Sequence, residues 1–317
     1  MTKNMNSKRP SPAAASVSGR SSGMGGSVAV LVLRFFGRTP LVFNHWLGRC
    51  LGYLVWRTGG RERHVAETNL AWCFPGNAPE WHQRMACESI KSMGAAMLEA
   101  PKLWRMSPVE LQARLENPKV LQEILSIYQQ GKGLVVASPH LGSWEYTGLL
   151  LASEISMITM FQPPKYPEVG RFVESARQRT GARLAPTDAA GIRALSKALA
   201  HGECVGILPD QEPEWGNGVF ATFFGRPAYT MFLLPRLVQK RRTPVLFVFS
   251  ERLEGGRYRM HCLQADDALY SKDREAACLA MNQAVEALVR KRLDQYNWNY
   301  KRFLTQPDGI DIYKKET

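Results

Sequence analysis

The sequence predicts an α/β protein with a mostly parallel central sheet flanked by helices. Short apolar runs typical of buried strands alternate along the chain with longer stretches of helical composition. Hydrophobic residues make up 45% of the 317 residues, which is enough to form a core and argues against disorder. The mean hydropathy of −0.25 excludes a protein with several membrane spans.

The first 60 residues differ from the rest of the chain. Residues 1–27 are rich in Ser, Gly and Ala and predict a disordered tail. Residues 28–36 and 41–56 are apolar but are interrupted by arginines and a proline, and no signal-peptide cleavage site follows them. We therefore expect residues 28–60 to form a membrane-associated helical segment that lies in the interface. A spanning helix and an ordinary buried helical hairpin are the two alternatives.

The elements of the remaining chain follow from composition and spacing. In parallel sheets the functional site usually lies beyond the carboxyl ends of the strands, which directs attention to the residues after Ala137 and after Leu208. The predicted helices cover 80–103, 108–130, a segment after residue 141, 169–180, 188–200, 231–239 and 272–294, and the predicted strands cover 133–137, 155–161, 204–208, 244–250 and 258–263.

Charge and motifs narrow the function further. The chain carries 41 Lys and Arg against 28 Asp and Glu, a net charge of +13 that calls for an anionic partner such as nucleic acid, a membrane surface or an acidic protein. The six cysteines form no C-x-x-C pair, which favours free thiols. No Walker A loop, dinucleotide glycine pattern or Gly-x-Ser-x-Gly elbow is present, and His140 has no second histidine nearby to share a metal.

The segment after the predicted strand at 133–137 carries the strongest catalytic signal. His140 precedes a probable helix, and Glu145 lies five residues further on, inside that helix. The two side chains can meet only if His140 lies on the incoming loop, which Pro139 favours. A histidine held by a carboxylate has a fixed tautomer and can act as a general base toward a hydroxyl. A helix-capping or structural histidine is the alternative.

Several sequence blocks resemble one family, the bacterial lipid A biosynthesis acyltransferases that add secondary acyl chains to lipid A. The Pro-His-Leu-Gly-Ser-Trp-Glu segment at 139–145 is similar to the His-x4-acid motif of glycerolipid acyltransferases. Two departures, Ser143 where the family often has Asn and Tyr300-Lys301-Arg302 where it often has His-Arg-Arg, bear on the acceptor rather than on the reaction. The other blocks are 61–70 with Cys-Phe-Pro at 73–75, Leu-Pro-Asp-Gln at 208–211, 223–228 with Thr230, and 295–303 ending at Pro307.

The resemblance implies a glycerolipid-acyltransferase-like fold, with an acyltransferase domain at 61–307 and a C-terminal tail at 308–317. It implies transfer of an acyl chain from an acyl carrier protein thioester to a hydroxyl of a lipid A precursor. His140 would remove the hydroxyl proton, and Glu145 would orient His140. No metal and no cofactor is expected. The expected place is the cytoplasmic face of the inner membrane, through peripheral contact or a single N-terminal anchor.

Other residues of these blocks are candidates for binding the acidic acceptor. Planar arginine side chains are suited to binding phosphates. Asp210 and Gln211, which follow the predicted strand at 204–208, are assigned to acceptor binding or to scaffolding of the site. The run at 240–242, together with Arg236, suits an acidic carrier protein or anionic lipid heads. The predicted substrate-binding residues are Arg226, Arg177, Arg179, Arg302, Asp210 and Gln211.

Three other functions compete with this interpretation. An acyltransferase of the same fold could act on an ornithine lipid, an aryl polyene or a mannosylated lipid, since the His-x4-acid motif does not separate acceptors. A non-catalytic membrane-binding protein is a second alternative, against which the intact His140 and Glu145 argue. A nucleic-acid-binding protein is the least favoured, because no RNA-recognition, homeodomain or zinc-finger pattern occurs.

Overall fold

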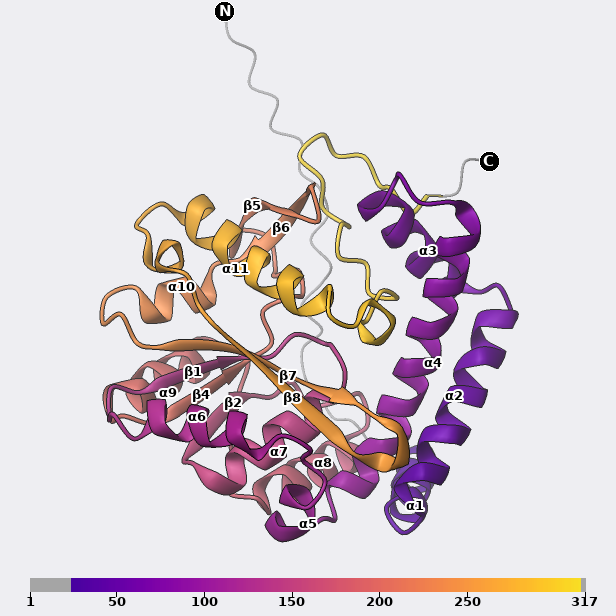
Figure 1. Cartoon of the computed structure of the whole chain (residues 1–317), viewed down its shortest axis with the longest axis horizontal. Helices are drawn as coiled ribbons and strands as arrows, with labels where there is room; N and C mark the ends of the chain where they lie inside the picture. Colours follow the sequence, from indigo (N-terminus) through magenta and orange to yellow (C-terminus); the bar gives the residue numbers. More distant parts are fainter. Residues whose placement is uncertain (1–23, 315–317) are drawn as a thin grey trace, which may run out of the picture.

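A computed structural model describes residues 24–314 of the chain and shows a mixed α/β architecture (Figure 1). The central sheet has six strands in the order β3-β2-β4-β1-β7-β8. The pairs that join β3 to β2, β2 to β4, β4 to β1 and β1 to β7 are all parallel, and only β8 runs antiparallel, along β7. The prediction of a mostly parallel sheet flanked by helices is therefore confirmed. The strands are β1 (Leu134–Ala137), β2 (Met157–Met160), β3 (Arg183–Ala185), β4 (Cys204–Ile207), β7 (Val245–Arg252) and β8 (Tyr258–Gln264).

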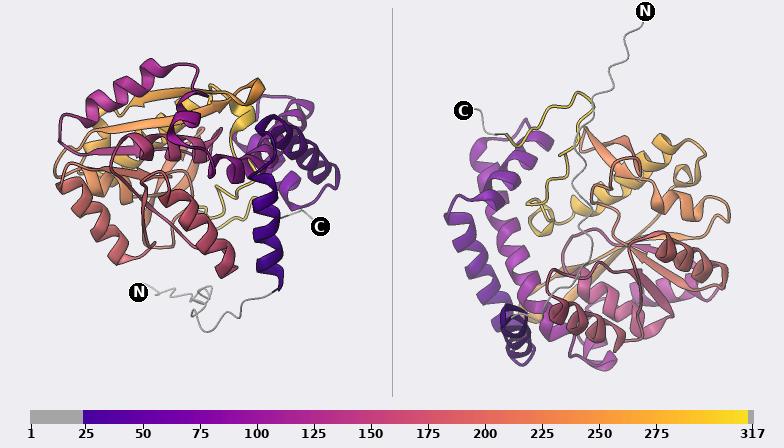
Figure 2. Two further views of the ribbon diagram at one scale, coloured as in Figure 1. Left: turned by 90° about the horizontal axis from the view of Figure 1, so that it is seen from below. Right: turned by 180° about the vertical axis from the view of Figure 1, so that it is seen from behind.

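Both faces are buried along β1, β4 and β7, which is why apolar residues dominate these strands. Along β1, Val135 and Ala137 point into one hydrophobic cluster, while Leu134 and Val136 point into another on the opposite face. Helices on either side of the sheet cover these faces (Figure 2). They are α6 (Pro118–Tyr128), α7 (Trp144–Glu154), α8 (Pro167–Gln178), α9 (Ala189–Ala200), α10 (Leu233–Val238) and α11 (Arg274–Val289), with the short α5 (Pro108–Gln112) before them.

A two-stranded antiparallel hairpin lies apart from the main sheet and packs against α11. Its strands are β5 (Gly218–Phe223) and β6 (Arg226–Met231). The sequence analysis did not predict either strand, nor the three-residue β3. The two-residue loop at Phe224 and Gly225 has positive φ at both positions, 48° and 74°, as tight hairpin turns require.

The described part of the chain begins with four helices, ahead of α5 and α6: α1 (Met24–Phe36), α2 (Leu41–Arg57), α3 (Arg61–Cys73) and α4 (Pro79–Leu103). The predicted tail at 1–27 lies outside the described residues as far as residue 23, and α1 begins at Met24. Helix α2 packs along α4 at very short range, because Gly48 of α2 faces Gly94 of α4. A β-carbon on either glycine would overlap the backbone of the other helix.

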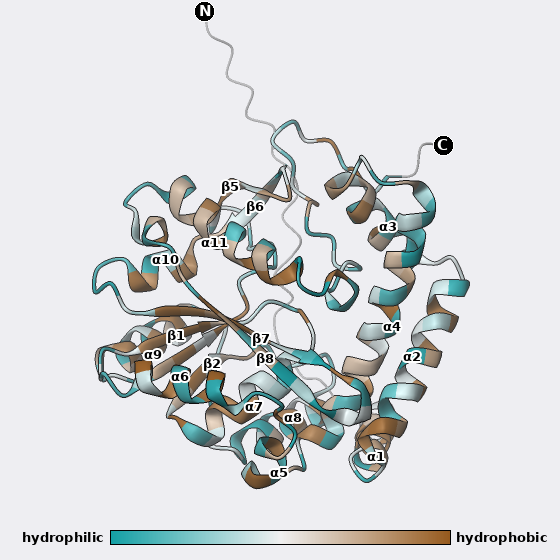
Figure 3. Cartoon of the chain, in the orientation of Figure 1, coloured by the Kyte–Doolittle hydropathy of each residue, from teal (hydrophilic) through white to brown (hydrophobic). Residues whose placement is uncertain are grey.

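The outer faces of α1 and α2 are apolar and exposed. No helix among the described residues is long and apolar enough to cross a membrane. Figure 3 shows α1 as strongly hydrophobic, although it lies at the edge of the molecule. The exposed apolar side chains of these two helices, which we term the α1–α2 apolar face, are Val28, Leu31, Val32, Phe35, Val42, Phe43, Trp46, Leu51, Tyr53, Leu54 and Val55.

The end of the described chain is built into the domain. Three 3-10 turns complete the fold, η1 (Glu254–Gly256), η2 (Asp267–Tyr270) and η3 (Leu293–Gln295). Beyond them, Tyr313 is buried and donates a hydrogen bond to Asn69 Oδ1 at 2.6 Å. The segment from residue 308 to Tyr313, predicted as part of a tail, thus packs on α3, and residues 315–317 lie outside the description.

Candidate active site

The parallel pairing of β1 and β4 creates the site. Their register aligns Ala137 with Ile207, so that the two chains leave the sheet side by side. His140 follows Ala137 by three residues, and Asp210 follows Ile207 by the same number. Equal offsets beyond aligned strand ends bring the two side chains together at one edge of the sheet.

His140 is held by Asp210 through two hydrogen bonds. The backbone N–H of His140 donates to Asp210 Oδ2 at 2.9 Å, and the imidazole Nδ1 lies 2.9 Å from Asp210 Oδ1. A carboxylate only accepts, so Nδ1 carries the proton and Nε2 keeps its lone pair. Gln211 Nε2 lies 3.3 Å from His140 Nε2. The result is a histidine whose unprotonated Nε2 is contacted by the Gln211 amide.

Asp210 is buried, whereas the His140 side chain keeps 17% of its surface exposed. Burial alone would raise the pKa of the Asp210 carboxyl. The neighbouring His140 and the hydrogen bonds from it outweigh burial and lower that pKa below its usual value. Asp210 is therefore a carboxylate at neutral pH, able to stabilise a positive charge that forms on the imidazole.

Glu145 has a different partner from the one expected. It is the second residue of α7, and it accepts hydrogen bonds from Trp104 Nε1 at 2.9 Å and from Arg177 Nε at 3.2 Å. Arg177 Nη2 also contacts Glu145 Oε1, so that guanidinium and carboxylate meet side by side. Among the described residues, the hydrogen bonds of His140 do not include one to Glu145. Glu145, the acid of the His-x4-acid motif, thus positions Arg177. The carboxylate that contacts His140 is that of Asp210, which follows β4, the neighbour of β1 in the sheet.

A cavity of about 1010 Å³ opens at these strand ends. The residues that line this cavity include His140 with Gln211, and Glu145 with Arg177. Apolar and aromatic side chains complete the wall, among them Trp144, Leu149, Met160, Phe161, Val219 and Phe232. The volume suits a long apolar group beside a few polar atoms.

Three of the predicted substrate-binding arginines do not line this cavity. Arg226 donates from Nε to the Trp72 carbonyl at 2.6 Å and stacks on that indole ring, which ties the β5–β6 hairpin to α3. Arg302 is buried and donates to Tyr229 O and to Thr230 Oγ1, each at 2.8 Å.

Arg179 is the third of these arginines. It is exposed and lies 3.4 Å from the Trp104 carbonyl oxygen. Of the six predicted substrate-binding residues, Asp210 and Gln211 contact His140, and Arg177 lines the same cavity, whereas Arg179, Arg226 and Arg302 contact other parts of the fold.

A buried ionic network that was not predicted from the sequence supports the loop that carries His140. Arg252, the last residue of β7, donates from Nη2 to Glu99 Oε1 at 2.6 Å and from Nε to Glu99 Oε2 at 2.8 Å. The same Nη2 donates to the Gly142 carbonyl at 3.0 Å, two residues after His140. His45 of α2 and the Tyr258 hydroxyl complete the set around Glu99, at 2.6 and 2.7 Å. The charged residues Glu251 and Arg252 at the end of β7 are a local sign of a polar role, but they do not identify Glu99 as the partner.

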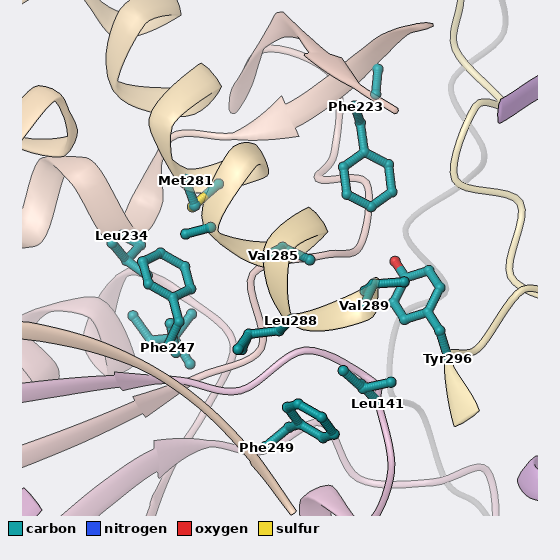
Figure 4. Packing of buried hydrophobic residues seen from close by; sticks show 14 of the residues in the cluster. Leu141, Phe223, Leu234, Phe247, Phe249, Met281, Val285, Leu288, Val289 and Tyr296 are labelled. Atoms are coloured by element: carbon teal, nitrogen blue, oxygen red, sulfur yellow. The ribbon is translucent and has the colours of Figure 1, made fainter. Parts of the chain in front are cut away.

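The rest of the loop backbone is equally well fixed. Gly142 N donates to the Gln295 carbonyl at 3.1 Å, and Ser143 N donates to the Ser250 carbonyl at 2.8 Å. Asn297 N donates to the His140 carbonyl at 3.0 Å. Figure 4 shows Leu141 beside Phe249 and Tyr296, so the loop is also anchored in the core. The catalytic histidine candidate therefore sits on rigid backbone.

The described residues contain no group of three or more His, Cys, Asp or Glu side chains that could hold a metal ion. All six cysteines lie in the described part of the chain and are free, as expected, and Cys73, Cys204 and Cys278 are buried.

Comparison with known proteins places this geometry in a family. The model of the bacterial lipid A biosynthesis acyltransferases matches residues 22–305, most of the chain. The chain belongs to this family. The geometry around His140 is accordingly the candidate active site of an acyltransferase.

Curated relatives from two bacteria agree with the match. A lipid A biosynthesis acyltransferase of Haemophilus influenzae is 26% identical over 288 residues, covering 90% of this chain and 89% of the relative. The lipid A biosynthesis lauroyltransferase of Escherichia coli is 24% identical over 275 residues, with 86% and 88% covered. The E. coli lipid A biosynthesis myristoyltransferase is 26% identical over 299 residues, with 92% and 91% covered. This lipid A acyltransferase thus matches relatives of different named acyl specificity about equally.

Proposed function

We propose that this protein transfers an acyl chain from an acyl carrier protein thioester to a hydroxyl of a lipid A precursor. The observation that carries the proposal is the His140–Asp210 pair on the wall of the cavity, in a chain that belongs to the lipid A acyltransferase family. The relatives are named for lauroyl and myristoyl transfer, and the cavity volume suits chains of that kind.

In the proposed reaction His140 Nε2 takes the proton from the acceptor hydroxyl while its oxygen attacks the thioester carbonyl carbon. Asp210 stabilises the imidazolium that forms. The tetrahedral intermediate then collapses, the carbon–sulfur bond breaks, and the imidazolium returns the proton to the leaving thiolate. The products are an ester and the free carrier thiol. The thioester is already activated, so no acyl-enzyme is required.

Arg177 is our candidate for stabilising the negative oxygen of that intermediate. Its Nε and Nη2 both donate hydrogen bonds to Glu145, which hold the guanidinium group in place on the cavity wall. Among the described residues nothing bonds to Nη1, which is left to donate to a substrate oxygen. A preorganised donor at a developing oxyanion is commonly worth a hundredfold or more in rate. Glu145 then acts as a positioning residue for Arg177.

The α1–α2 apolar face is proposed to rest on the membrane that contains the acceptor. Its exposed Leu, Val, Phe, Trp and Tyr side chains are typical of helices that lie in the interface. Arg49 and Lys91 border Trp46 and Tyr53 in a small surface pocket there, and both pair with Glu88.

Purified protein, an acyl carrier protein thioester and a lipid A precursor provide the test, with the lipid product followed by mass spectrometry. The proposal expects a mass gain of one acyl chain with the wild type and none with His140→Ala. Lipid extracts from cells with and without the gene then identify the natural acceptor. A missing acyl chain on a lipid other than lipid A would contradict the proposed acceptor.

A further inference from the structure

Two further arginines, Arg236 and Arg274, line the cavity beside His140. Arg236 lies on α10, and Arg274 is the first residue of α11. Both are exposed, and neither forms an ion pair with a residue that the structure describes. The Arg274 guanidinium carbon lies 5.1 Å from the Phe232 ring centroid, a contact that orients it without neutralising it. Two unpaired guanidinium groups therefore face the space that holds the substrates.

Four of the carboxylates near these arginines have other hydrogen-bond or ion-pair partners, whereas Glu214 on the cavity wall and Glu275 beside Arg274 form no ion pair with a described residue. Asp273 caps α11 by accepting from Glu275 N at 2.9 Å, and Asp266 accepts from Ala268 N at 2.8 Å. Asp267 pairs with Arg242 at 2.7 Å. Glu212, on the cavity wall, accepts from Thr305 N at 2.9 Å.

Outside the cavity the positive charge continues along the surface. Lys240, Arg241 and Lys272 are exposed at the end of α10 and just before α11, and none forms an ion pair with a described residue. Asp273 and Glu275, on either side of Arg274 in the chain, are exposed acids. We term Arg236, Lys240, Arg241, Lys272 and Arg274 the α10–α11 basic surface.

The position of this surface indicates which substrate it meets. Helix α10 and the α1–α2 apolar face lie at opposite ends of the longest axis of the molecule, in Figure 1 and in both views of Figure 2. If the apolar face rests on the membrane, the α10–α11 basic surface points away from it, toward water. A water-soluble anionic substrate can reach it, whereas a lipid in the bilayer approaches from the other end.

We infer that the α10–α11 basic surface docks the acyl carrier protein, with Arg236 and Arg274 binding the phosphodiester of its phosphopantetheine arm. This inference rests on the proposed function and adds the surface at which the acyl donor docks. Arginine suits this role because its planar fork binds two phosphate oxygens at once. Lys240 and Arg241 lie further out, where the acidic carrier itself would rest. The thioester at the end of the arm would then reach His140 through the shared cavity.

Steady-state kinetics of Arg236→Gln/Arg274→Gln test the inference, with the acyl carrier protein and the lipid acceptor varied in turn. The expected result is a KM for the acyl carrier protein raised about 10-fold or more, with kcat and the KM for the acceptor changed less than about twofold. Added salt should raise the wild-type KM for the donor and have a weaker effect on the variant. Acyl-pantetheine, which lacks the phosphate, should have the same KM with both proteins.

Arg84→Gln/Lys119→Gln is the matched control, because it removes two exposed, unpaired charges from α4 and α6, away from the cavity. Its donor KM should stay within about twofold of the wild type. A raised KM for the acceptor alone would assign the arginines to acceptor phosphates and overturn the inference, as would an unchanged donor KM. If the wild type does not use the acyl carrier protein at all, the proposed function fails instead.

Discussion

Replacing Asp210 by Asn tests the orientation of His140, the proposed general base, with almost no change in volume. In the wild type both carboxylate oxygens accept hydrogen bonds at 2.9 Å, one from the His140 backbone and one from the imidazole Nδ1. The Asn side-chain oxygen can keep the backbone bond. Its NH₂ group then faces Nδ1 and donates to it, which moves the imidazole proton to Nε2. The base is lost at the nitrogen that faces the cavity.

The loss should be large, because the wrong tautomer cannot accept the hydroxyl proton and no carboxylate stabilises the imidazolium. We expect kcat to fall by about 10² to 10⁴-fold, which corresponds to about 2.7 to 5.4 kcal/mol of transition-state stabilisation. The KM values should change little, since Asp210 lies behind His140. The assay is single-turnover acyl transfer with donor and acceptor in excess of KM, measured by mass spectrometry.

Asp188→Asn is the matched control, since Asp188 caps α9 by accepting from Gly191 N at 2.9 Å and does not line the cavity. Asn is also a good helix cap, so activity and melting temperature should both stay close to wild type. A folded Asp210→Asn protein with kcat within threefold of wild type would refute the role of Asp210 and the tautomer argument with it.

Three further predictions concern the support of the site. Glu99→Gln leaves the buried Arg252 guanidinium without its counter-charge, so the free energy of unfolding should drop by about 3 to 5 kcal/mol in urea titrations; no change would show that the network does not stabilise the fold. Burial raises the pKa of Glu99 and of Asp210, but Arg252 and His140 respectively outweigh it and lower both values. Both carboxylates therefore stabilise the native state above a pH of about 4, and their contribution should be lost as the pH falls further. The melting temperature should be flat from about pH 5 to 7 and should decline below about pH 4. A melting temperature that rises on acidification would contradict these pKa directions. Gly142→Ala should lower both stability and kcat, because Gly142 has φ +60° and an added β-carbon would overlap the Ser250 carbonyl oxygen; wild-type kcat and melting temperature would show that the loop is not held as described.

The sequence predicted the strand ends that build the site, because buried parallel strands are continuous apolar runs and polar residues directly after them stand out. His140, Asp210 and Gln211 were found in this way. Their pairing was not, because it depends on β4 lying next to β1, and strand order in a sheet is set by long-range packing. Without the strand order, Glu145 was the nearest acid in the chain and was expected to contact His140. In the structure it contacts Arg177 instead.

The β5–β6 hairpin and the Glu99–Arg252 network were missed for different reasons. The hairpin has a local sequence pattern, a Gly in a two-residue loop between two short alternating segments. The strand prediction did not use this pattern. The network joins residues of α4 and β7 that are 153 positions apart, and no local pattern reports such a contact. Arg226 and Arg302 illustrate the same limit, since an arginine in a family-like block can as well hold the fold together as bind a substrate.

The central claim is that His140, with Asp210 behind it, moves an acyl chain from the carrier protein to the lipid acceptor. Its most direct test is the rate of product formation by wild type and His140→Ala, measured by mass spectrometry with acyl carrier protein thioester and lipid A precursor, on proteins of equal melting temperature. The account predicts a product one acyl chain heavier with the wild type and a rate at least about 100-fold lower with the variant. Equal rates would contradict it.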